Sequence, residues 1–539
     1  MRKVLVSLLL LFTFAPTQAQ RPKPTLVVVL VADQMRADYL TTYGTEFQHG
    51  LSTLMTRGAW YQNAAYPYYN TVTCAGHTTI GTGDLPFHHG MIANAWFNRE
   101  TGKSQTCDQD DKVNEIPYGN VPGVAATALA NAGDSARWML VPTLAEIMRK
   151  SMKSRVATMS IKARSAIGLA GHEGDFITWL DERGAWTTSS AYTAAPAVWF
   201  TTFLQANPIN RDADKTWNLT LPPDRYKYED DAPGETGSAG WGRTFPHKLG
   251  PAGAPFLLHW LQSPFSDDYL EQMAEAAVND LHLGQNADRT DFLGVSFSAL
   301  DIVGHGYGPR SDEVQDVLVR LDATIGKLID FMDKKVGADK YVLAFSADHG
   351  VADVPEQVSD AGRVNAATIR ATVDAAAKTA LGGDGPFVAA MSGGDIYFLP
   401  GVYGRLTQDP AAIRAVIDAM LKVPGVARVI RSEEIATSAA RASKDRMIRA
   451  AALSYFPDRS GDLTVVPKEN WILAGGGTTH GTGYTYDQHV PVILFGAGIR
   501  PGVHQDAVTP ADIAPTLASI IDVRLASSDG QVLRTALMK

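Results

Sequence analysis

Hydrophobic runs of strand length recur along the chain and are separated by longer mixed segments. The runs are rich in Val, Leu, Ile and Ala and show no alternation of polar and apolar positions. Such continuity predicts strands buried on both faces, as in parallel sheets. The five runs cover residues 25–32, 155–161, 291–300, 341–347 and 490–495.

The segment between the third and fourth runs has a helical period. Ser311 is the expected N-cap, Asp312 and Glu313 follow in the first turn, and apolar residues recur every three or four positions as far as Ile329. A strand, a helix and a second strand in this order predict parallel pairing. The predicted fold class is therefore α/β, with a mostly parallel central sheet flanked by helices.

Two segments interrupt this pattern and predict large insertions in a single domain of residues 20–539. Residues 172–262 hold six of the ten tryptophans, with many Pro, Gly and Asp residues and little periodicity. They predict a cap over the sheet edge whose aromatic residues form a small core of their own. Residues 355–471 alternate strand-like and helix-like stretches and predict a small α+β subdomain.

The amino end has the pattern of a secretory signal peptide at residues 1–19. Arg2 and Lys3 precede an apolar run, and small residues follow up to Ala19, after which we expect cleavage. The run is shorter than the ~20 residues needed to span a membrane. No later segment is long and apolar enough to do so. The sequence thus predicts a periplasmic or secreted protein.

The net charge bears on the choice of binding partner, and the cysteine content bears on whether the protein has a disulfide. The net charge of −9 disfavours nucleic acid or an anionic membrane as a stable partner, so an anionic substrate would need a local positive site. The two cysteines, Cys74 and Cys107, can form a disulfide in an oxidising compartment or remain two free thiols. The oligomeric state is not determined by the sequence.

Thr73 lies where a loop is expected to become a helix, in the stretch 70–83, which is rich in small residues that would let a ligand approach the backbone. The first amides of a helix are free donors with partial positive charge, so a phosphate bound there would meet N–H groups and a hydroxyl nucleophile together. Taken alone, Thr73 has a simpler explanation as a residue of an ordinary helix start.

Reactive side chains follow or flank the predicted strands. Because open α/β sheets bind ligands at the carboxyl ends of their strands, we expect these side chains to lie close together. Three carboxylates and three imidazoles suit two mixed O/N sites of the kind zinc accepts, and two metals ~4 Å apart are typical of phosphoryl transfer. The set comprises Asp33, Lys162, Arg164, Asp301, His305 (four residues on, across a glycine-rich loop), Asp348, His349 and His480.

The motifs together resemble the alkaline phosphatase superfamily over nearly all of the mature chain. Within it, the Thr nucleophile is shared with nucleotide pyrophosphatase/phosphodiesterases, and Lys162-Ala-Arg164 resembles the Lys-x-Arg pair of the phosphate-irrepressible alkaline phosphatases, which are monoesterases. The motifs are the strand before Asp33, Thr73-Cys-Ala-Gly-His77, Thr82-Gly-Asp-Leu-Pro-Phe-His-His-Gly90, Asp301-x-x-x-His305, Asp348-His349-Gly350 and His480-Gly.

The resemblance implies a role for each matching residue. One Zn²⁺ is expected on Asp301, His305 and His480. A second is expected on Asp33, Asp348, His349 and the oxygen of Thr73. Thr73 would attack phosphorus in line and form a phosphothreonine, while Lys162, Arg164 and Asn94 bind the substrate's phosphoryl oxygens. The implied activity is hydrolysis of small-molecule phosphate monoesters.

Departures from neighbouring branches sharpen this hypothesis and leave two alternatives. The Thr73 motif lacks the Cys/Ser-x-Pro-x-Arg pattern of sulfatases and the Asp-Ser-Ala context of Ser-nucleophile alkaline phosphatases, in which a third metal stands where Lys162 is expected. One alternative is a phosphodiesterase or nucleotide pyrophosphatase of the same fold. The other is an inactive protein that binds metal or phosphate. Neither the physiological substrate nor the metal's identity beyond ligand preference follows from the sequence.

Overall fold

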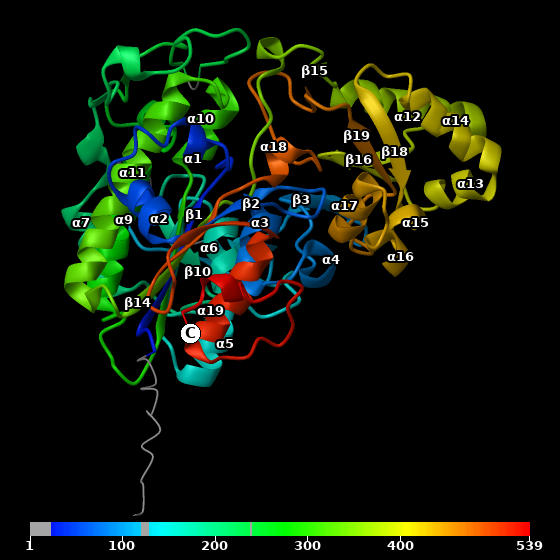
Figure 1. Ribbon diagram of the computed structural model, residues 1–539. Helices are drawn as coiled ribbons and strands as arrows, with labels where there is room; N and C mark the ends of the chain where they lie inside the picture. The colour runs from blue at the N-terminus through cyan, green and yellow to red at the C-terminus, as the bar shows by residue number, and fades with distance from the viewer. Residues whose placement is uncertain (1–22, 120–128, 238–239, 539) are drawn as a thin grey trace, which may run out of the picture.

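The computed structural model describes residues 23–119, 129–237 and 240–538. The predicted signal peptide, with its cleavage after Ala19, lies outside these residues. Figure 1 shows a main body built on one large sheet and, beside it, a smaller unit of strands and helices that includes α12, α14 and β18.

The large sheet confirms the predicted fold class. It has ten strands in the order β22-β2-β21-β14-β1-β13-β8-β9-β10-β6. At its centre, β1, β13, β14, β8 and β9 are parallel to one another, and β21 is antiparallel to β14. The strands are β1 (Leu26–Ala32), β2 (Ala59–Ala64), β6 (Glu115–Pro117), β8 (Val156–Ser160), β9 (Phe176–Leu180), β10 (Trp186–Ser189), β13 (Asp291–Phe297), β14 (Tyr341–Ser346), β21 (Val492–Gly496) and β22 (Gly502–Val508).

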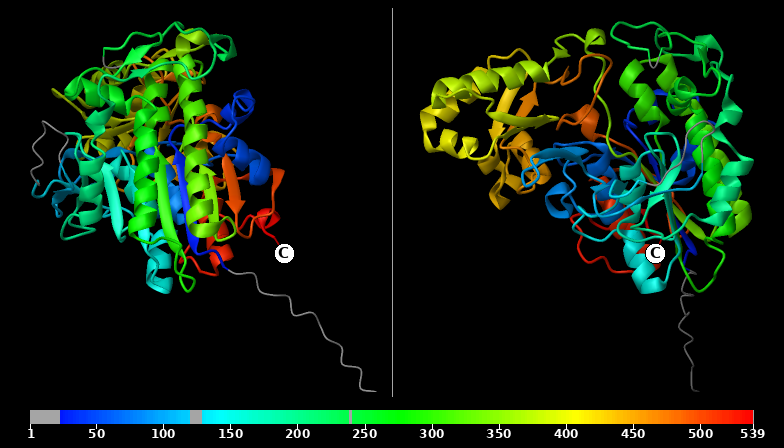
Figure 2. Two further views of the ribbon diagram at one scale, coloured as in Figure 1. Left: turned by 90° about the vertical axis from the view of Figure 1, so that its left-hand side faces the viewer. Right: turned by 180° about the vertical axis from the view of Figure 1, so that it is seen from behind.

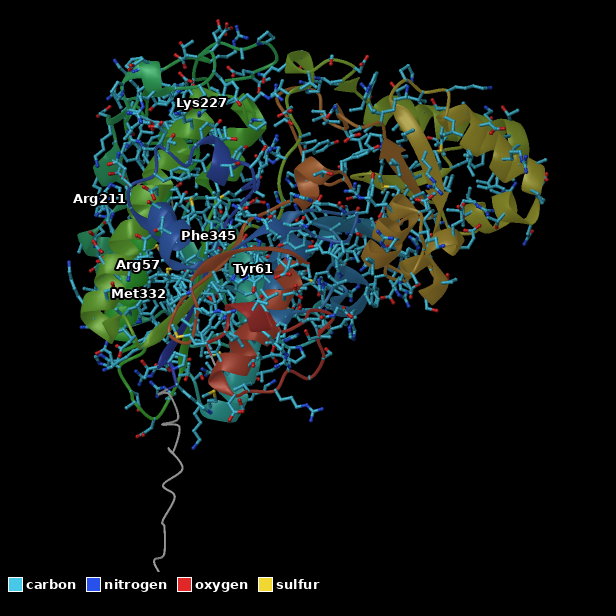
Figure 3. All side chains as sticks on the ribbon, in the orientation of Figure 1. Arg57, Tyr61, Arg211, Lys227, Met332 and Phe345 are labelled. Atoms are coloured by element: carbon cyan, nitrogen blue, oxygen red, sulfur yellow. A yellow bond between two sulfur atoms is a disulfide. The ribbon has the colours of Figure 1, made fainter. Side chains whose placement is uncertain are left out.

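Helices cover both faces of this sheet, which explains why β1 is apolar at every position. Val28 and Leu30 pack in one core with α9 (Phe265–Asp280) and α11 (Asp312–Met332). Val27, Val29 and Val31 point to the opposite face and pack with α5 (Leu144–Met152) and α19 (Ile513–Ile521). Figure 2 shows the first helix layer in front of the sheet, and Figure 3 shows side chains such as Met332 and Phe345, both fully buried, filling the layers.

The first predicted insertion begins later than residue 172, because β9 and β10 are strands of the central sheet. The remainder, between β10 and α9, contains α7 (Val198–Ala206), α8 (Ala254–Leu261) and the short pair β11 (Thr216–Trp217) and β12 (His247–Lys248). The expectation of a separate aromatic core is wrong, since Trp217 and Trp260 are fully buried in the main core cluster with α9 and α11. Close packing onto those helices removes more apolar surface from water than an isolated loop core could.

The segment of the second predicted insertion carries a sheet of its own. Its four antiparallel strands have the order β16-β17-β19-β18. They are β16 (Val388–Ser392), β17 (Asp395–Phe398), β18 (Val426–Arg431) and β19 (Leu463–Pro467). Two helices, α12 (Ala366–Leu381) and α14 (Pro410–Met420), pack on the sheet and share a separate core with it. This unit projects to the side of the main body in Figures 1 and 2.

Candidate active site

The predicted reactive residues meet at one edge of the central sheet. Asp33 directly follows β1, and Asp348 and His349 lie just after β14. His480 lies before β21, at its amino end, but β21 is antiparallel to β14, so its amino end falls at the same edge as the carboxyl ends of the parallel strands. One antiparallel strand thus brings a remote loop histidine to the site.

Asp301 and His305 are not in a glycine-rich loop as predicted. Both belong to α10 (Ala299–Tyr307), where four-residue spacing puts them on one face. The helix forms because the buried Asp267 carboxylate accepts the N–H groups of Ser298 and Ala299 at 3.0 and 3.2 Å. Gly304 is needed because a Cβ there would lie 2.1 Å from the Oε1 atom of Gln34.

Thr73 is the first residue of α3 (Thr73–Thr82), as the sequence predicts, and all ten residues of this helix are buried. The glycines of α3 are explained by close packing of the helix rather than by the approach of a ligand. A Cβ at Gly76 would lie 2.2 Å from the backbone oxygen of Asp348, and one at Gly81 would lie 2.4 Å from the oxygen of Gly168. Small residues therefore let α3 pack directly on the metal-ligand candidate Asp348 and on α6 (Ala163–Ala170).

Lys162 bridges two of the three buried carboxylates. Its Nζ atom lies 2.6 Å from Asp33 Oδ2 and 2.5 Å from Asp301 Oδ2. Burial lowers the pKa of Lys162, but the charges of Asp301 and Asp33 outweigh it and raise that pKa above its usual value. Burial, together with Asp301 and Asp348, raises the pKa of Asp33. The ammonium thus offsets part of a dense negative charge.

The three histidines present the same ring nitrogen to this cluster. Their Nδ1 atoms lie within hydrogen-bond distance of backbone carbonyl oxygens: His305 of Thr478 (2.9 Å), His349 of Gly350 (3.0 Å) and His480 of Thr71 (2.8 Å). A proton held at Nδ1 leaves Nε2 with a lone pair, the arrangement usual for metal-ligating histidines. Burial lowers the pKa of His349 and of His480, which favours the neutral ligand form.

These Nε2 atoms converge with carboxylate oxygens. His305 and His480 Nε2 lie 3.2 and 3.8 Å from Asp301 Oδ1. His349 Nε2 lies 3.5 Å from Asp33 Oδ1, 3.4 Å from Asp348 Oδ2 and 3.5 Å from Thr73 Oγ1. Apart from the 3.2 Å contact of His305, these distances are too long for good hydrogen bonds but suit ligand atoms that share a cation.

The donor set fits divalent metal ions. Two groups have ligand atoms close enough to hold an ion: Asp301 with His305 and His480, and Asp33 with Asp301 and His349. In addition, Asp33 Oδ1 and Asp348 Oδ2 are buried without a hydrogen-bond partner. A buried, unpaired carboxylate oxygen is costly unless a cation neutralises it. Metal dependence follows from this arrangement, whereas the number and kind of ions do not.

The remaining two candidates, Asn94 and Arg164, lie at the starts of two helices, α3 and α6. The Oδ1 atom of Asn94 accepts the backbone N–H of Cys74 at 2.8 Å, which places the Asn94 amide against the first turn of α3. Arg164 stands on the first turn of α6, its Nε is buried without a hydrogen-bond partner, and its charge acts on Lys162. An amide and a guanidinium are both groups that can donate hydrogen bonds to an anion.

Comparison with known proteins gives the family. The model of the type I phosphodiesterase/nucleotide pyrophosphatase family matches residues 27–490. The chain belongs to this family.

Several known proteins align with this chain over nearly its full length. Alkaline phosphatase PafA of Elizabethkingia meningoseptica is 31% identical, with 94% of this chain and 93% of PafA aligned. A protein of Myroides odoratus named a calcium-transporting ATPase is 29% identical over 96% of each chain. The crystal structure of wild-type PafA superposes with a TM-score of 0.85 at 29% identity and covers 96% of this chain and all of PafA. The predicted resemblance to the alkaline phosphatase superfamily is confirmed.

Sequence reasoning missed Gln34, which connects the two groups of ligands in this phosphodiesterase-family site. Its backbone N–H donates to Asp348 Oδ1 at 3.1 Å, and its Nε2 donates to Asp301 Oδ1 at 2.6 Å. Gln34 has φ = 69°, a left-handed conformation that is costly for a non-glycine residue. Its position directly after Asp33 was the available signal, but no sequence pattern predicts this backbone.

His77 is the second missed residue, although the predicted motif contains it. Its Nδ1 lies 3.0 Å from the backbone oxygen of Thr73 and 3.2 Å from Asp348 Oδ2. Its Nε2 lies 2.7 Å from Ser296 Oγ. Four-residue spacing on a helix was the signal that could have linked His77 to Thr73. His77 thereby joins the start of α3 to Asp348 and to β13.

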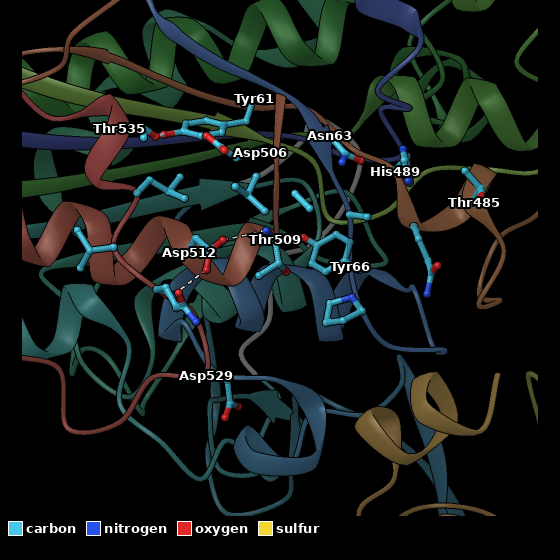
Figure 4. A pocket seen from close by; sticks show the side chains of 18 of the residues that line it. Tyr61, Asn63, Tyr66, Thr485, His489, Asp506, Thr509, Asp512, Asp529 and Thr535 are labelled. Atoms are coloured by element: carbon cyan, nitrogen blue, oxygen red, sulfur yellow. Dashed lines mark hydrogen bonds between the residues drawn. The ribbon is translucent and has the colours of Figure 1, made fainter. Parts of the chain in front are cut away.

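Two other features of the family member do not belong to this site. A cavity of about 1040 Å³, lined by residues such as Tyr61, His489 and Thr509, contains none of the reactive residues described above. Figure 4 shows it beside β2 and the carboxyl-terminal segment. A further group of possible ligands comprises Asp84, His88 and Asp529. Its hydrogen bonds attach the carboxyl-terminal segment to the rest of the protein. Asp529 N donates to Asp84 Oδ1 (3.1 Å), and Leu85 N donates to Asp529 Oδ2 (2.9 Å).

Proposed function

We propose that this protein is an exported phosphomonoesterase that uses Thr73 as its nucleophile and two zinc ions. Hydrolysis of phosphate monoesters rests on full-length similarity to PafA and to further relatives that are also named alkaline phosphatases. Export rests on the leader sequence at residues 1–19. Among the residues that the structure describes, no helix has the length and apolar character to cross a membrane.

The observation that carries the proposal is the convergence of Thr73 with unpaired carboxylate oxygens and oriented imidazoles. The residues that would hold one zinc ion are Asp301, His305 and His480. Those that would hold the other are Asp33, Asp348, His349 and Thr73. When bound, two such ions supply positive charge that favours the ionised hydroxyl and the departing oxygen.

The reaction at this chain's own residues proceeds by exchange of one P–O bond for another. Thr73 Oγ1 gives its proton to water and forms a bond to phosphorus, the bond to the leaving oxygen breaks, and that oxygen takes up a proton from water to leave as the alcohol. A phosphothreonine results, and a water molecule then replaces Thr73 at phosphorus and returns the proton to its oxygen. Because Thr73 is at the start of α3, the partial positive charge of this helix end favours the bound anion.

Lys162, Arg164 and Asn94 orient the phosphoryl oxygens and neutralise the charge that gathers on them. Lys162 supports this role indirectly as well, because its contacts to Asp33 and Asp301 hold the two ligand groups together. A monoester carries about two negative charges near neutral pH and a diester carries one. A second cation beside the reacting phosphorus therefore favours the monoester.

A phosphodiesterase of the same fold is the second candidate, since the matching family model is described by that activity. Replacing both Lys162 and Arg164 with Ala separates the two. Loss of a charged contact to the transferred group typically costs ~10²–10³ in rate. We expect kcat/KM for an aryl monophosphate to fall by at least that factor and kcat/KM for a diester to fall far less. An equal loss on both substrates would contradict a monoesterase.

A further inference from the structure

A covalent bond lies beside the proposed nucleophile and has no role in the chemistry above. Cys74 and Cys107 form a disulfide across 33 residues of sequence. Cys74 directly follows Thr73 in the first turn of α3, and Cys107 directly follows β4 (Lys103–Thr106). Both cysteines are buried in one cluster with Ile92 and Trp96. The open question of two thiols or one disulfide is thereby answered in favour of the disulfide.

The other partner in this arrangement is Asn94. It directly precedes β3 (Ala95–Asn98), whose residue Ala95 pairs with Thr106 of β4. Asn94 and Cys107 are therefore the next pair at the base of this hairpin, and Cys107 N donates to the Asn94 backbone oxygen at 3.0 Å. The side chain of Asn94 in turn accepts the Cys74 N–H at 2.8 Å.

These contacts form a closed ring of restraints around one side chain. The Cys74 N–H donates a hydrogen bond to the Asn94 side chain, and the Cys107 N–H donates one to the Asn94 backbone oxygen. The disulfide joins the two cysteines. Because Oδ1 is used by a backbone N–H, the amide cannot rotate freely, and Nδ2 is the group that remains to donate to an anion. The disulfide adds a covalent link between the hairpin base and the first turn of α3 to the Asn94 hydrogen bond and the apolar packing of the cluster.

We propose that the Cys74–Cys107 disulfide is a positioning element that fixes Asn94 for binding a phosphoryl oxygen at Thr73. The proposal rests on the proposed function for the identity of the anion. A misplacement of about 1 Å in a binding group can lower a rate by up to ~10²-fold. The disulfide therefore contributes to catalysis through Asn94, in addition to any effect on folding.

A purely structural disulfide is the competing explanation, and it makes a different prediction. A cross-link of this length stabilises a protein mainly by restricting its unfolded chain. Such an effect lowers thermal stability when the bond is removed, but leaves the affinity of the folded protein for phosphate unchanged. The two explanations are separated by measuring both quantities on the same variants.

The test is a double-mutant cycle between the cysteine pair and Asn94. The variants are Cys74→Ala with Cys107→Ala, Asn94→Ala, and the triple substitution, each compared with the wild-type holoenzyme. We expect removal of both cysteines to lower kcat/KM for an aryl monophosphate by about 10-fold, with the loss mostly in KM. In the Asn94→Ala background the same removal should change kcat/KM by less than about 2-fold, because coupled residues are not additive.

The matched control is Met139→Ala, which opens a cavity in the same cluster and leaves Cys74, Cys107 and Asn94 unsubstituted. It should lower the melting temperature but leave kcat/KM unchanged. Equal losses from cysteine removal in the wild-type and Asn94→Ala backgrounds would overturn the proposal, as would a loss in Met139→Ala of the same size.

Binding of inorganic phosphate distinguishes failure of this proposal from failure of the proposed function. Calorimetric titration needs no turnover, and we expect about 10-fold weaker phosphate binding after cysteine removal. Weaker binding in a protein without phosphatase activity would support the positioning role and contradict the proposed function. Unchanged phosphate affinity in an active enzyme would overturn the positioning role alone, and a wild-type protein that binds no phosphate would overturn both.

Discussion

Two groups of buried acids in this molecule differ in how their charge is neutralised. At the sheet edge, Asp33, Asp301 and Asp348 surround the Lys162 ammonium and the three imidazoles. Beside the start of α11, Glu235 of the cap segment and Asp312 and Glu313 of the helix are as deeply buried, and each has one oxygen without a hydrogen-bond partner. Unpaired buried carboxylates are therefore common to both groups.

Most of their pKa values differ in direction: those of Asp301 and Asp348 are lowered, although that of Asp33 is raised by burial and by these two acids. At the sheet edge burial raises the pKa of Asp301, but Lys162 and His305 outweigh it and hold that pKa well below the usual value. In the second group, burial first and the neighbouring acids second raise the pKa of Glu313 to about 10 and that of Glu235 to about 8. His247, next to Glu313, has its pKa lowered to about 4 by burial and is neutral at pH 7. At pH 7, protons neutralise Glu313 and Glu235, whereas the Lys162 ammonium offsets part of the charge of Asp33 and Asp301.

The comparison teaches that burial of acids alone does not identify a metal site. The decisive features are histidines with Nδ1 fixed on backbone carbonyls and carboxylate oxygens within reach of their Nε2 atoms. In the second group, His247 contacts Glu313 through Nε2, which lies 2.8 Å from Glu313 Oε1, an ordinary hydrogen-bond distance.

Among the variants that compare the two groups of acids, removal of a metal ligand should have the largest effect. For His480→Ala we expect one of the two zinc ions to be lost and kcat/KM to fall by well over 100-fold, since even groups behind the ligands commonly cost ~10–100-fold. Metal analysis of the purified protein and steady-state kinetics check this. His172→Ala, a histidine that pairs with Glu146 away from the site, is the control and should change neither quantity. Full activity of metal-free protein would contradict the proposed centre.

Gln34→Gly should have an intermediate effect on zinc affinity and kcat/KM, which depend on the sheet-edge acids. Glycine removes the amide that donates to Asp301 but accepts the left-handed backbone, so zinc affinity and kcat/KM should fall about 10-fold while the melting temperature stays within a few degrees. Lys153→Gly is the matched control, because Lys153 has φ = 56° at the end of α5 and no contact with the site. Unchanged zinc affinity in Gln34→Gly would show that the bridge to Asp301 is dispensable.

Glu313→Gln should have the smallest effect, on stability alone and only through pH. The folded-state pKa of Glu313, about 10, exceeds its unfolded value near 4.5, so the folded protein holds an extra proton between these values. This contribution to stability is complete below pH 4.5 and is lost as pH rises toward 10. Melting temperatures from pH 6 to 9 should therefore fall more steeply in the wild type than in Glu313→Gln.

Asp312→Asn is the control for that slope, because the Asp312 pKa is raised only to about 6. Its substitution should flatten the pH dependence of stability below about pH 6 and leave the alkaline part unchanged. A wild type and Glu313→Gln with parallel melting curves from pH 6 to 9 would mean that Glu313 is ionised in the folded state.

The sequence predicts those parts of the site that follow directly from strands. Asp33 and Asp348 come after continuous apolar runs, and such runs are recognisable because both faces of the sheet are covered. Thr73 is predicted from another local pattern, a helix start that is rich in small residues. Local patterns therefore give the fold class and most candidate residues.

The remaining features depend on contacts between distant segments, which local patterns do not contain. The helix that carries Asp301 is capped by Asp267 from α9, and the cap has no sequence signal near residue 301. The left-handed backbone of Gln34 is held by Asp348, more than three hundred residues away. The start of the first insertion was misplaced because β9 and β10 are short and lie among the irregular residues of that segment.

The central claim is that phosphate passes through Thr73, and trapping that intermediate tests it most directly. The wild-type zinc enzyme, mixed with an aryl monophosphate and quenched in acid, should yield one phosphorylated peptide with the phosphate on Thr73 by fragmentation mass spectrometry. Thr73→Ala should yield none and lose about 10⁴-fold or more in kcat, as enzymes do on loss of a nucleophile, with its fold and zinc-binding side chains otherwise retained. Phosphate on another residue, or rapid turnover by Thr73→Ala, would contradict the account.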